Sequence, residues 1–188
     1  MTTLATAPGI ANGLDLDALD QMVEAIGRDP AAAIVGFRVT TDWAGQTRSR
    51  SLVESYTIGG TEVPRSFTIE ADEPVELLGS NGAPNPQELL MSALNACMMV
   101  GYVAQAAVRG ITLDSCRIET SGKLDLRGFL GLSDDVAVGY RQLDYTVHIK
   151  GDGTAEQFAE IHQAVMKTSP NYFNMARPIR MNGTLELA

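Results

Sequence analysis

The chain has 188 residues, of which 45% are hydrophobic and 20% are charged, and it carries a formal net charge of −9. This length and composition predict one soluble globular domain, with or without an extra terminal element, that is long enough to bury a core. The acidic balance and the lack of a basic cluster argue against a nucleic-acid binder and against a protein bound to anionic membranes.

The N-terminal residues predict a tail followed by one helix. Residues 1–12 are small and polar, predict disorder and show no signal-peptide pattern, so we expect a cytoplasmic protein. Apolar residues from Leu14 to Ile26 recur at a helical period, and an aspartate near the start can cap that helix. We therefore expect residues 1–30 to form a tail with an extra helix and residues 31–188 to form the main domain.

The main domain alternates between strand and helix patterns. Strands are predicted from Ile34 to Thr41, Arg50 to Thr57, Val63 to Glu70, Leu113 to Leu124, Leu143 to Lys150 and Ile179 to Leu187. Helices are predicted from Asn85 to Val108 and from Thr154 to Thr168, where Ser169-Pro170 ends the second one. The glycine-rich run Arg127–Leu132 with Asp134-Asp135 predicts a surface loop. This order favours an α+β fold with an antiparallel sheet.

The first of these two helices has a clear start and end. Asn85 is placed as the N-cap, Pro86 as the first helical residue, and Glu88 can reach back to complete a capping box. Arg109-Gly110 closes the helix with a basic residue and a glycine. Leu89 to Ala107 carries no charge and approaches the length of a membrane span. Small and polar residues within it favour a helix buried in a soluble protein or its dimer.

Cys97 lies about three turns inside this helix, where it is either an inert core residue or a reactive thiol. At about 100° per residue, Glu88 and Tyr102 point to the opposite face, and Gln87 is a closer neighbour of the thiol. The residues that share its face are small or apolar: Leu90, Ala93, Leu94, Val100, Gly101 and Ala104. Such a stripe lets another backbone approach closely. A reactive thiolate at Cys97 therefore needs a cation from another element.

The other cysteine and the histidines offer little chemistry. Cys116 lies near a strand start and fits a core or boundary role, and His148 falls on the strand face opposite its apolar neighbours. Nothing near Cys97 in the sequence supplies the histidine that a cysteine hydrolase needs. Two cysteines and two histidines cannot form a spaced zinc cluster, so we expect no metal and no cofactor.

Three features resemble the OsmC/Ohr family of osmotically inducible and organic hydroperoxide resistance proteins. They are the run Asn-Pro-Gln-Glu-Leu-Leu-Met-Ser-Ala-Leu-Asn-Ala-Cys from Asn85 to Cys97, the exit Arg109-Gly110-Ile111, and the proline-led turn after the second helix. The match covers residues 34–188 in element order. The resemblance implies an intertwined homodimer, with the central helices buried and the active sites at the subunit interface.

The resemblance also implies a chemistry for the helix cysteine. In active members this cysteine attacks a hydroperoxide and becomes a sulfenic acid, and a second cysteine before a proline then forms a disulfide with it. Cys97 matches the attacking cysteine. The resolving position falls on Ser169, which cannot form a disulfide.

Two further residues of the family hold the thiolate: a glutamate at the helix start and an arginine from the N-terminal strands. The glutamate position falls on Gln87, with Glu88 one place later, so its charge is lost or displaced. The arginine is either Arg48 in the first hairpin or Arg65 on the third strand. The aromatic pair Tyr172-Phe173 falls where the resemblance places the pocket wall, and packing against a dimer partner explains the same pair equally well.

Two functions follow from this mapping. The first is the reduction of organic hydroperoxides through Cys97, with an external thiol in place of the missing internal one. The alternative is a non-catalytic OsmC-like dimer that binds a small apolar ligand, in which Cys97 is only buried. The positions of Ser169 and Gln87 favour the alternative, and the position of Cys97 favours the peroxidase.

Overall fold

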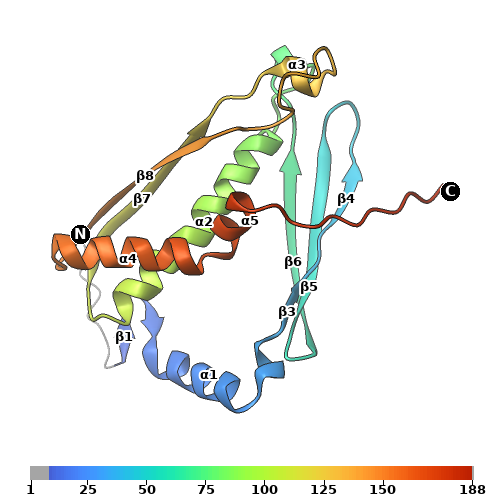
Figure 1. Ribbon diagram of the computed structural model, residues 1–188. Helices are drawn as coiled ribbons and strands as arrows, with labels where there is room; N and C mark the ends of the chain where they lie inside the picture. Colours follow the sequence, from blue (N-terminus) through green and yellow to red (C-terminus); the bar gives the residue numbers. More distant parts are fainter. Residues whose placement is uncertain (1–8, 188) are drawn as a thin grey trace. The chain divides into compact units, whose positions relative to one another are not determined.

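The computed structural model describes residues 9–187, which form helices and antiparallel strands (Figure 1). They fall into two compact units, the first ending at Ser92 and the second beginning at Ala93. The predicted α+β class with antiparallel pairing is confirmed. Residues 1–8 of the expected tail lie outside the described residues.

The first unit opens with a short hairpin and a helix. Strand β1 (Ile10–Ala11) pairs antiparallel with β2 (Leu14–Asp15), so the expected disorder up to residue 12 is wrong at β1. Helix α1 (Leu16–Arg28) follows, and the Asp15 carboxylate caps it by accepting from the Ala18 N–H at 2.9 Å. A 3₁₀ turn, η1 (Pro30–Ala33), leads into the sheet.

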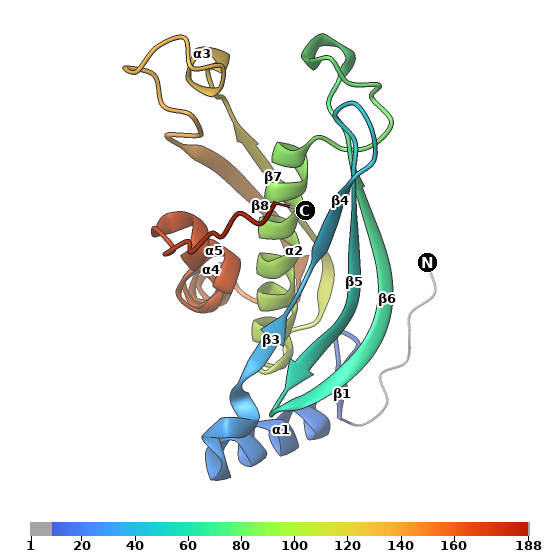
Figure 2. The same ribbon diagram turned by 90° about the vertical axis from the view of Figure 1, so that its right-hand side faces the viewer.

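A strongly paired hairpin forms the centre of the first unit. Strands β5 (Ser49–Ile58) and β6 (Thr61–Ala71) pair along their length, and Figure 2 shows them side by side with β4. The segment predicted as one strand from Ile34 is instead two, β3 (Val35–Phe37) and β4 (Thr40–Trp43), which pair with successive parts of β5. The interruption between them divides the strand without changing its partner.

Helix α2 (Pro86–Ala107) begins in the first unit and runs through the second. It ends within one residue of the prediction, at a turn where Gly110 has φ +68°, a backbone conformation that favours glycine. By length and composition alone α2 can cross a membrane, and the core helix of a soluble protein passes the same test. Its buried residues Leu94, Met98, Tyr102 and Ala106 recur every four positions, as they do in a helix with one face in a core.

The second unit packs α2 against a strand pair and a second helix. Strands β7 (Leu113–Gly122) and β8 (Leu143–Gly151) pair antiparallel, and α3 (Leu126–Phe129) lies in their connection, where a surface loop was predicted. Helix α4 (Ala155–Thr168) starts after Thr154, as predicted, and Thr154 and Gln157 form a capping box there. Its fully buried Ile161 and Val165 join the core residues of α2, and each such side chain contributes about 1.5–3 kcal/mol on burial.

At the C-terminal end, one prediction is incomplete and another is wrong. Pro170 does not only end α4, because it also begins a short helix, α5 (Pro170–Ala176), in which proline occupies the first helical position. The segment from Ile179 to Leu187, predicted as a strand, is extended and has no ladder partner among the described residues.

Candidate functional site

The loop that leads into α2 is built around a buried aspartate. This segment, residues 72–85, is called the Asp72 loop below. The Asp72 side chain is 1% exposed. It accepts from the Ser80 hydroxyl at 2.6 Å, the Gly82 N–H at 2.9 Å and the Thr47 hydroxyl at 2.7 Å. These bonds, that of Ser80 first, hold the pKa of Asp72 well below its usual range.

The start of α2 uses both residues predicted for it. The Asn85 side chain accepts from the Gln87 N–H at 2.7 Å, and the Glu88 carboxylate accepts from the Asn85 N–H at 2.8 Å. The Asn85 side chain also bonds Glu73 of the Asp72 loop. The Glu88 side chain is therefore engaged in capping its own helix. Gln87 takes part in the same cap through its backbone N–H.

Cys97 and Ser169 lie together, although 72 residues separate them in the chain. The Ser169 hydroxyl donates to Cys97 Sγ at 3.3 Å. Cys97 is a half-buried free thiol, and Ser169 is 5% exposed. The position that the resemblance assigns to the resolving cysteine therefore touches the attacking one, with a hydroxyl in place of a second sulfur.

The turn of α2 from Ala93 to Cys97, called the Cys97 turn below, is hydrogen-bonded to two other elements, β7 and α5. Asn95 accepts from the Thr120 hydroxyl of β7 at 2.5 Å and donates to the Ile118 carbonyl at 3.4 Å. From α5, the Asn171 amide donates to the Ala93 carbonyl at 2.8 Å. The sulfur thus sits on a helical turn with polar anchors to two other elements.

The small-residue stripe predicted around Cys97 admits a close neighbour at Gly101. A Cβ built there would lie 3.2 Å from both γ-carbons of Val165, on α4. Ser169 lies one turn beyond Val165, and its N–H donates to the Val165 carbonyl at 2.8 Å. The absence of a side chain at Gly101 therefore lets the end of α4 reach α2. The buried face itself is centred on Met98 and includes Tyr102, which the sequence placed opposite the thiol.

The aromatic pair on α5 divides between the core and the surface. Tyr172 packs edge-on against Tyr145 of β8, with ring centroids 6.2 Å apart. Phe173 is 51% exposed, and the Arg177 guanidinium lies over its ring at 4.8 Å. One member of the predicted pocket wall is thus a core contact, and the other forms an exposed cation–π pair.

Both candidate arginines lie in the first unit, each with partners of its own there. Arg48, in the hairpin between β4 and β5, donates to the Ala44 carbonyl at 3.4 Å. The Arg65 guanidinium on β6 lies 5.1 to 5.9 Å from the ring centroids of Phe37, Tyr56 and Phe67. The expectation that one of them approaches Cys97 stays a prediction.

Cys116 and His148 differ from Cys97 in their surroundings. Cys116 packs against the core from β7, and burial raises the pKa of its thiol. His148 is exposed and faces Glu119 at 3.4 Å across the β7–β8 ladder. Among residues 9–187, no group of three or more His, Cys, Asp or Glu side chains is placed to hold a metal ion.

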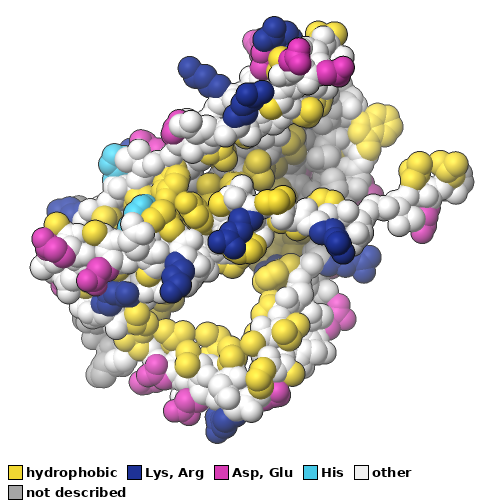
Figure 3. Space-filling view, viewed as in Figure 1, with side chains coloured by type: hydrophobic (Ala, Val, Ile, Leu, Met, Phe, Trp, Pro, Cys, Tyr) yellow, Lys and Arg dark blue, Asp and Glu magenta, His cyan; other side chains and the backbone are white. Residues whose placement is uncertain are grey.

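A groove of about 510 Å³ lies between β8 and α4. Figure 3 shows hydrophobic side chains gathered between these two elements. Tyr102 forms the buried end of the groove, where its hydroxyl is hydrogen-bonded to His162 Nδ1. Burial, together with nearby Tyr145 and Cys116, raises the pKa of Tyr102. Its phenol is therefore a neutral hydrogen-bonding group at neutral pH.

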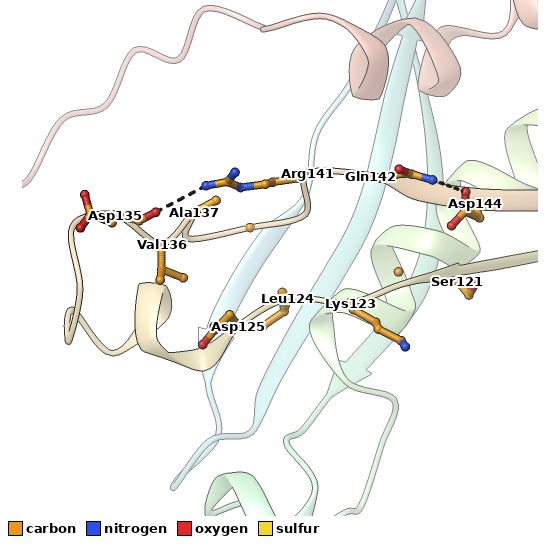
Figure 4. A pocket seen from close by; sticks show the side chains of 12 residues that line it. Ser121, Lys123, Leu124, Asp125, Asp135, Val136, Ala137, Arg141, Gln142 and Asp144 are labelled. Atoms are coloured by element: carbon orange, nitrogen blue, oxygen red, sulfur yellow. Dashed lines mark hydrogen bonds between the residues drawn. The ribbon is translucent and has the colours of Figure 1, made fainter.

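A separate cavity of about 600 Å³ lies elsewhere in the second unit, between the end of β7 and the segment before β8. Figure 4 shows polar and charged side chains around it, with Arg141 bonded to the Asp135 carbonyl and Gln142 to Asp144. Its lining includes Lys123 and excludes both Cys97 and Ser169. It is thus separate from the cysteine site.

Two contacts made by residues of α5 and its C-cap were not predicted from the sequence. Asn171 contacts a main-chain carbonyl 78 positions away, and no local pattern signals such a bond. Arg177 pairs with Phe173 four residues earlier, which is the spacing of one helical turn. That spacing is visible in the sequence and was a usable signal.

Comparison with known proteins gives a consistent result. A family model described as OsmC-like protein matches residues 79–182, which is more than half of the chain. No curated protein matches the sequence. Among solved structures, an OsmC-like protein from Mycoplasma pneumoniae superposes with a TM-score of 0.56 at 16% identity, covering 74% of this chain and 86% of that one.

Two further solved structures are similar in fold. A Psychrobacter arcticus protein named for osmotic stress induction and detoxification response gives a TM-score of 0.53 at 16% identity, covering 72% of this chain and 85% of its own. An OsmC-like protein of unknown function from Vibrio cholerae gives 0.53 at 13% identity, covering 73% and 91% respectively. At such identities the likeness concerns the fold.

Proposed function

Because the chain belongs to the OsmC-like family, we propose that it reduces organic hydroperoxides through Cys97 and uses an external thiol as the reductant. The observation that carries this proposal is the contact between Cys97 Sγ and the Ser169 hydroxyl at 3.3 Å. This contact places a hydrogen-bond donor at the sulfur, and the thiolate is the nucleophilic form of a cysteine.

The proposed reaction has three steps. The Cys97 thiolate attacks the terminal oxygen of the hydroperoxide, the O–O bond breaks, and the alkoxide leaves and takes a proton to become the alcohol. An external thiol then attacks the resulting sulfenic acid, which forms a mixed disulfide and releases water. A second external thiol releases the Cys97 thiol and leaves as the oxidised disulfide.

The partners of this reaction are also part of the proposal. We propose a small apolar hydroperoxide as substrate, because the Cys97 turn lies beside apolar and aromatic side chains such as Met98 and Tyr172. We propose a homodimer in which Arg48 or Arg65 supplies the cation for the thiolate. A cytoplasmic location fits the need for a thiol reductant, because thiols are kept reduced there.

The direct test is the consumption of cumene hydroperoxide with dithiothreitol as the reductant. Cys97→Ser is expected to lower the rate by about 100-fold or more, because the attacking sulfur is lost. Cys116→Ala serves as the matched control and is expected to retain the rate of the parent protein. Equal rates for the parent and Cys97→Ser would end the peroxidase proposal.

The alternative, an OsmC-like dimer that binds a small apolar ligand without turnover, is favoured by Ser169 at the resolving position. The same assay separates the two functions. If the parent consumes no hydroperoxide and Cys97 reacts with alkylating reagents as slowly as Cys116, the ligand-binding function is preferred.

A further inference from the structure

The first residues of α5 touch the Cys97 turn at two points. The Ser169 hydroxyl donates to Cys97 Sγ at 3.3 Å, and the Asn171 amide donates to the Ala93 carbonyl at 2.8 Å. In an α-helix the Ala93 carbonyl is also the acceptor for the Cys97 N–H, four residues on. The two bonds from α5 therefore reach the sulfur and the backbone acceptor of the same residue.

The Ser169 hydroxyl has its direction set by its own helix. Ser169 is the N-cap of α5, and its oxygen accepts from the Tyr172 N–H at 3.4 Å. A serine hydroxyl has one proton to donate. With the Tyr172 N–H on the acceptor side, that proton points to Cys97. Because Ser169 is 5% exposed, little water competes for it.

Asn171 keeps this geometry in place. The contact between α4 and α2 at Gly101 and Val165 brings the end of α4 close, but it lies one turn before Ser169. The Asn171 bond to Ala93 supplies a second fixed point on the far side of Ser169. The hydroxyl is thus held between two contacts rather than at the end of a free turn.

We propose that Ser169 and Asn171 act as a positioning pair for Cys97, in which Ser169 stabilises the thiolate and Asn171 holds Ser169 against it. This proposal rests on the proposed peroxidase function and assigns the residues that prepare its nucleophile. A hydrogen bond donated to a charged sulfur favours the thiolate over the thiol. After oxygen transfer, the serine offers no sulfur for a disulfide, so the sulfenic acid is left for the external thiol.

The test measures the rate at which iodoacetamide alkylates Cys97 as a function of pH, with Cys116→Ala as the background so that one thiol remains. Ser169→Ala is expected to move the midpoint of this profile upward by about one pH unit, because the thiolate loses its donor. Asn171→Ala is expected to move it in the same direction by a smaller amount. Thr168→Ala and Asn174→Ala, neighbours without these contacts, are the matched controls and should leave the midpoint in place.

Ser169→Ala also removes the N-cap of α5 and could therefore act by destabilising the fold. A second set of variants separates that effect from loss of the hydrogen bond to Cys97. Ser169→Thr keeps the hydroxyl and is expected to restore the midpoint of the parent. Ser169→Cys is expected to form an intrachain disulfide with Cys97 on treatment with diamide. The loss of two free thiols per chain in a thiol titration measures this disulfide. No disulfide in folded Ser169→Cys would overturn the geometry on which the pair depends.

The alkylation profile and the hydroperoxide assay separate the two proposals. A shifted profile in a protein that consumes no hydroperoxide supports the positioning pair and overturns the peroxidase function. Hydroperoxide consumption with a Ser169→Ala profile that coincides with that of Thr168→Ala overturns the pair and leaves the peroxidase function standing.

Discussion

The Asp72 loop precedes helix α2 and the Cys97 turn lies within it, and these two polar regions use hydrogen bonds in different ways. The Asp72 carboxylate accepts from two hydroxyls and three backbone N–H groups. Within the described residues, Cys97 Sγ has one partner, the Ser169 hydroxyl. The five bonds to Asp72 fix the backbone around its carboxylate, whereas the sulfur of Cys97 accepts from a single donor.

This difference assigns separate roles to the two regions. The bonds around Asp72 join the β4–β5 hairpin at Thr47 to the loop before α2, and Asn85 of that loop caps the helix. We infer that the Asp72 loop is a scaffold for the helix start. The Cys97 turn holds the sulfur on which the proposed function depends, and most of its polar contacts hold the helix rather than surround the sulfur.

The largest expected effect on stability is at Asp72. Asp72→Asn places an amide NH₂ where the carboxylate accepts from the Ser80 and Gly82 N–H groups, so donors would face donors. We expect the thermal midpoint to fall by roughly 5–10 °C. Glu76→Gln, an exposed change in the same loop, is the control. A midpoint equal to that of the control would remove the scaffold role of Asp72.

The same residue gives a pH dependence of known sign. Because the pKa of Asp72 is depressed in the folded state, its contribution is present above the usual carboxyl pKa of about 3.9 and is lost as the pH falls below it. Urea unfolding of the parent between pH 6 and pH 3 should show this loss. In Asp72→Asn that part of the acid sensitivity should be absent, and an unchanged pH profile would contradict the assignment.

A smaller effect is expected at Gly101, where it tests the packing of the Cys97 turn. Gly101→Ala adds a methyl group 3.2 Å from the buried Val165, and such overpacking costs about 1–3 kcal/mol. The better helix propensity of alanine offsets up to about 1 kcal/mol. We expect a net loss of about 1 kcal/mol in urea unfolding and slower alkylation of Cys97, because α4 must move away together with Ser169.

Gly139→Ala is the matched control for this substitution. Gly139 has no heavy atom near the position of an added Cβ, so its stability should be equal to or slightly above that of the parent. If Gly101→Ala were as stable as Gly139→Ala and Cys97 reacted at an unchanged rate, the contact with α4 would not control the Cys97 turn.

Local signals in the sequence were enough for most of the fold. The caps at Asn85 and Thr154 use residues within four positions of one another, so their patterns predicted the starts of α2 and α4. Proline after Ser169 was interpreted only as a stop, although the same residue suits the first position of a new helix. The segment Ile179 to Leu187 alternates like a strand, but a strand needs a partner that alternation cannot identify.

The resemblance to the family was enough to predict which residues of the candidate site lie close together. Contacts that depend on long-range packing were not predictable from the sequence. The resemblance placed Ser169 opposite Cys97, and the structure brings the two side chains together. Helical periodicity described the face around Cys97, but Tyr102 is buried because β8 and α4 cover that side. The Asn171 bond to Ala93 joins residues 78 positions apart, and only the folded arrangement of α5 on α2 creates it.

The smallest effect is expected at Cys116. It tests whether the Cys97 thiol is more reactive than the other cysteine of the chain. Burial raises the pKa of Cys116, so its thiolate is scarce at pH 8, and its alkylation should be at least about 10-fold slower than that of Cys97. Cys116→Ala should cost less than about 1 kcal/mol of stability, because only one half-buried sulfur is lost from the packing. The two rates are measured in Cys116→Ala and Cys97→Ser, each with one thiol left. Equal rates would mean that the Ser169 contact gives Cys97 no advantage over a cysteine packed against the core.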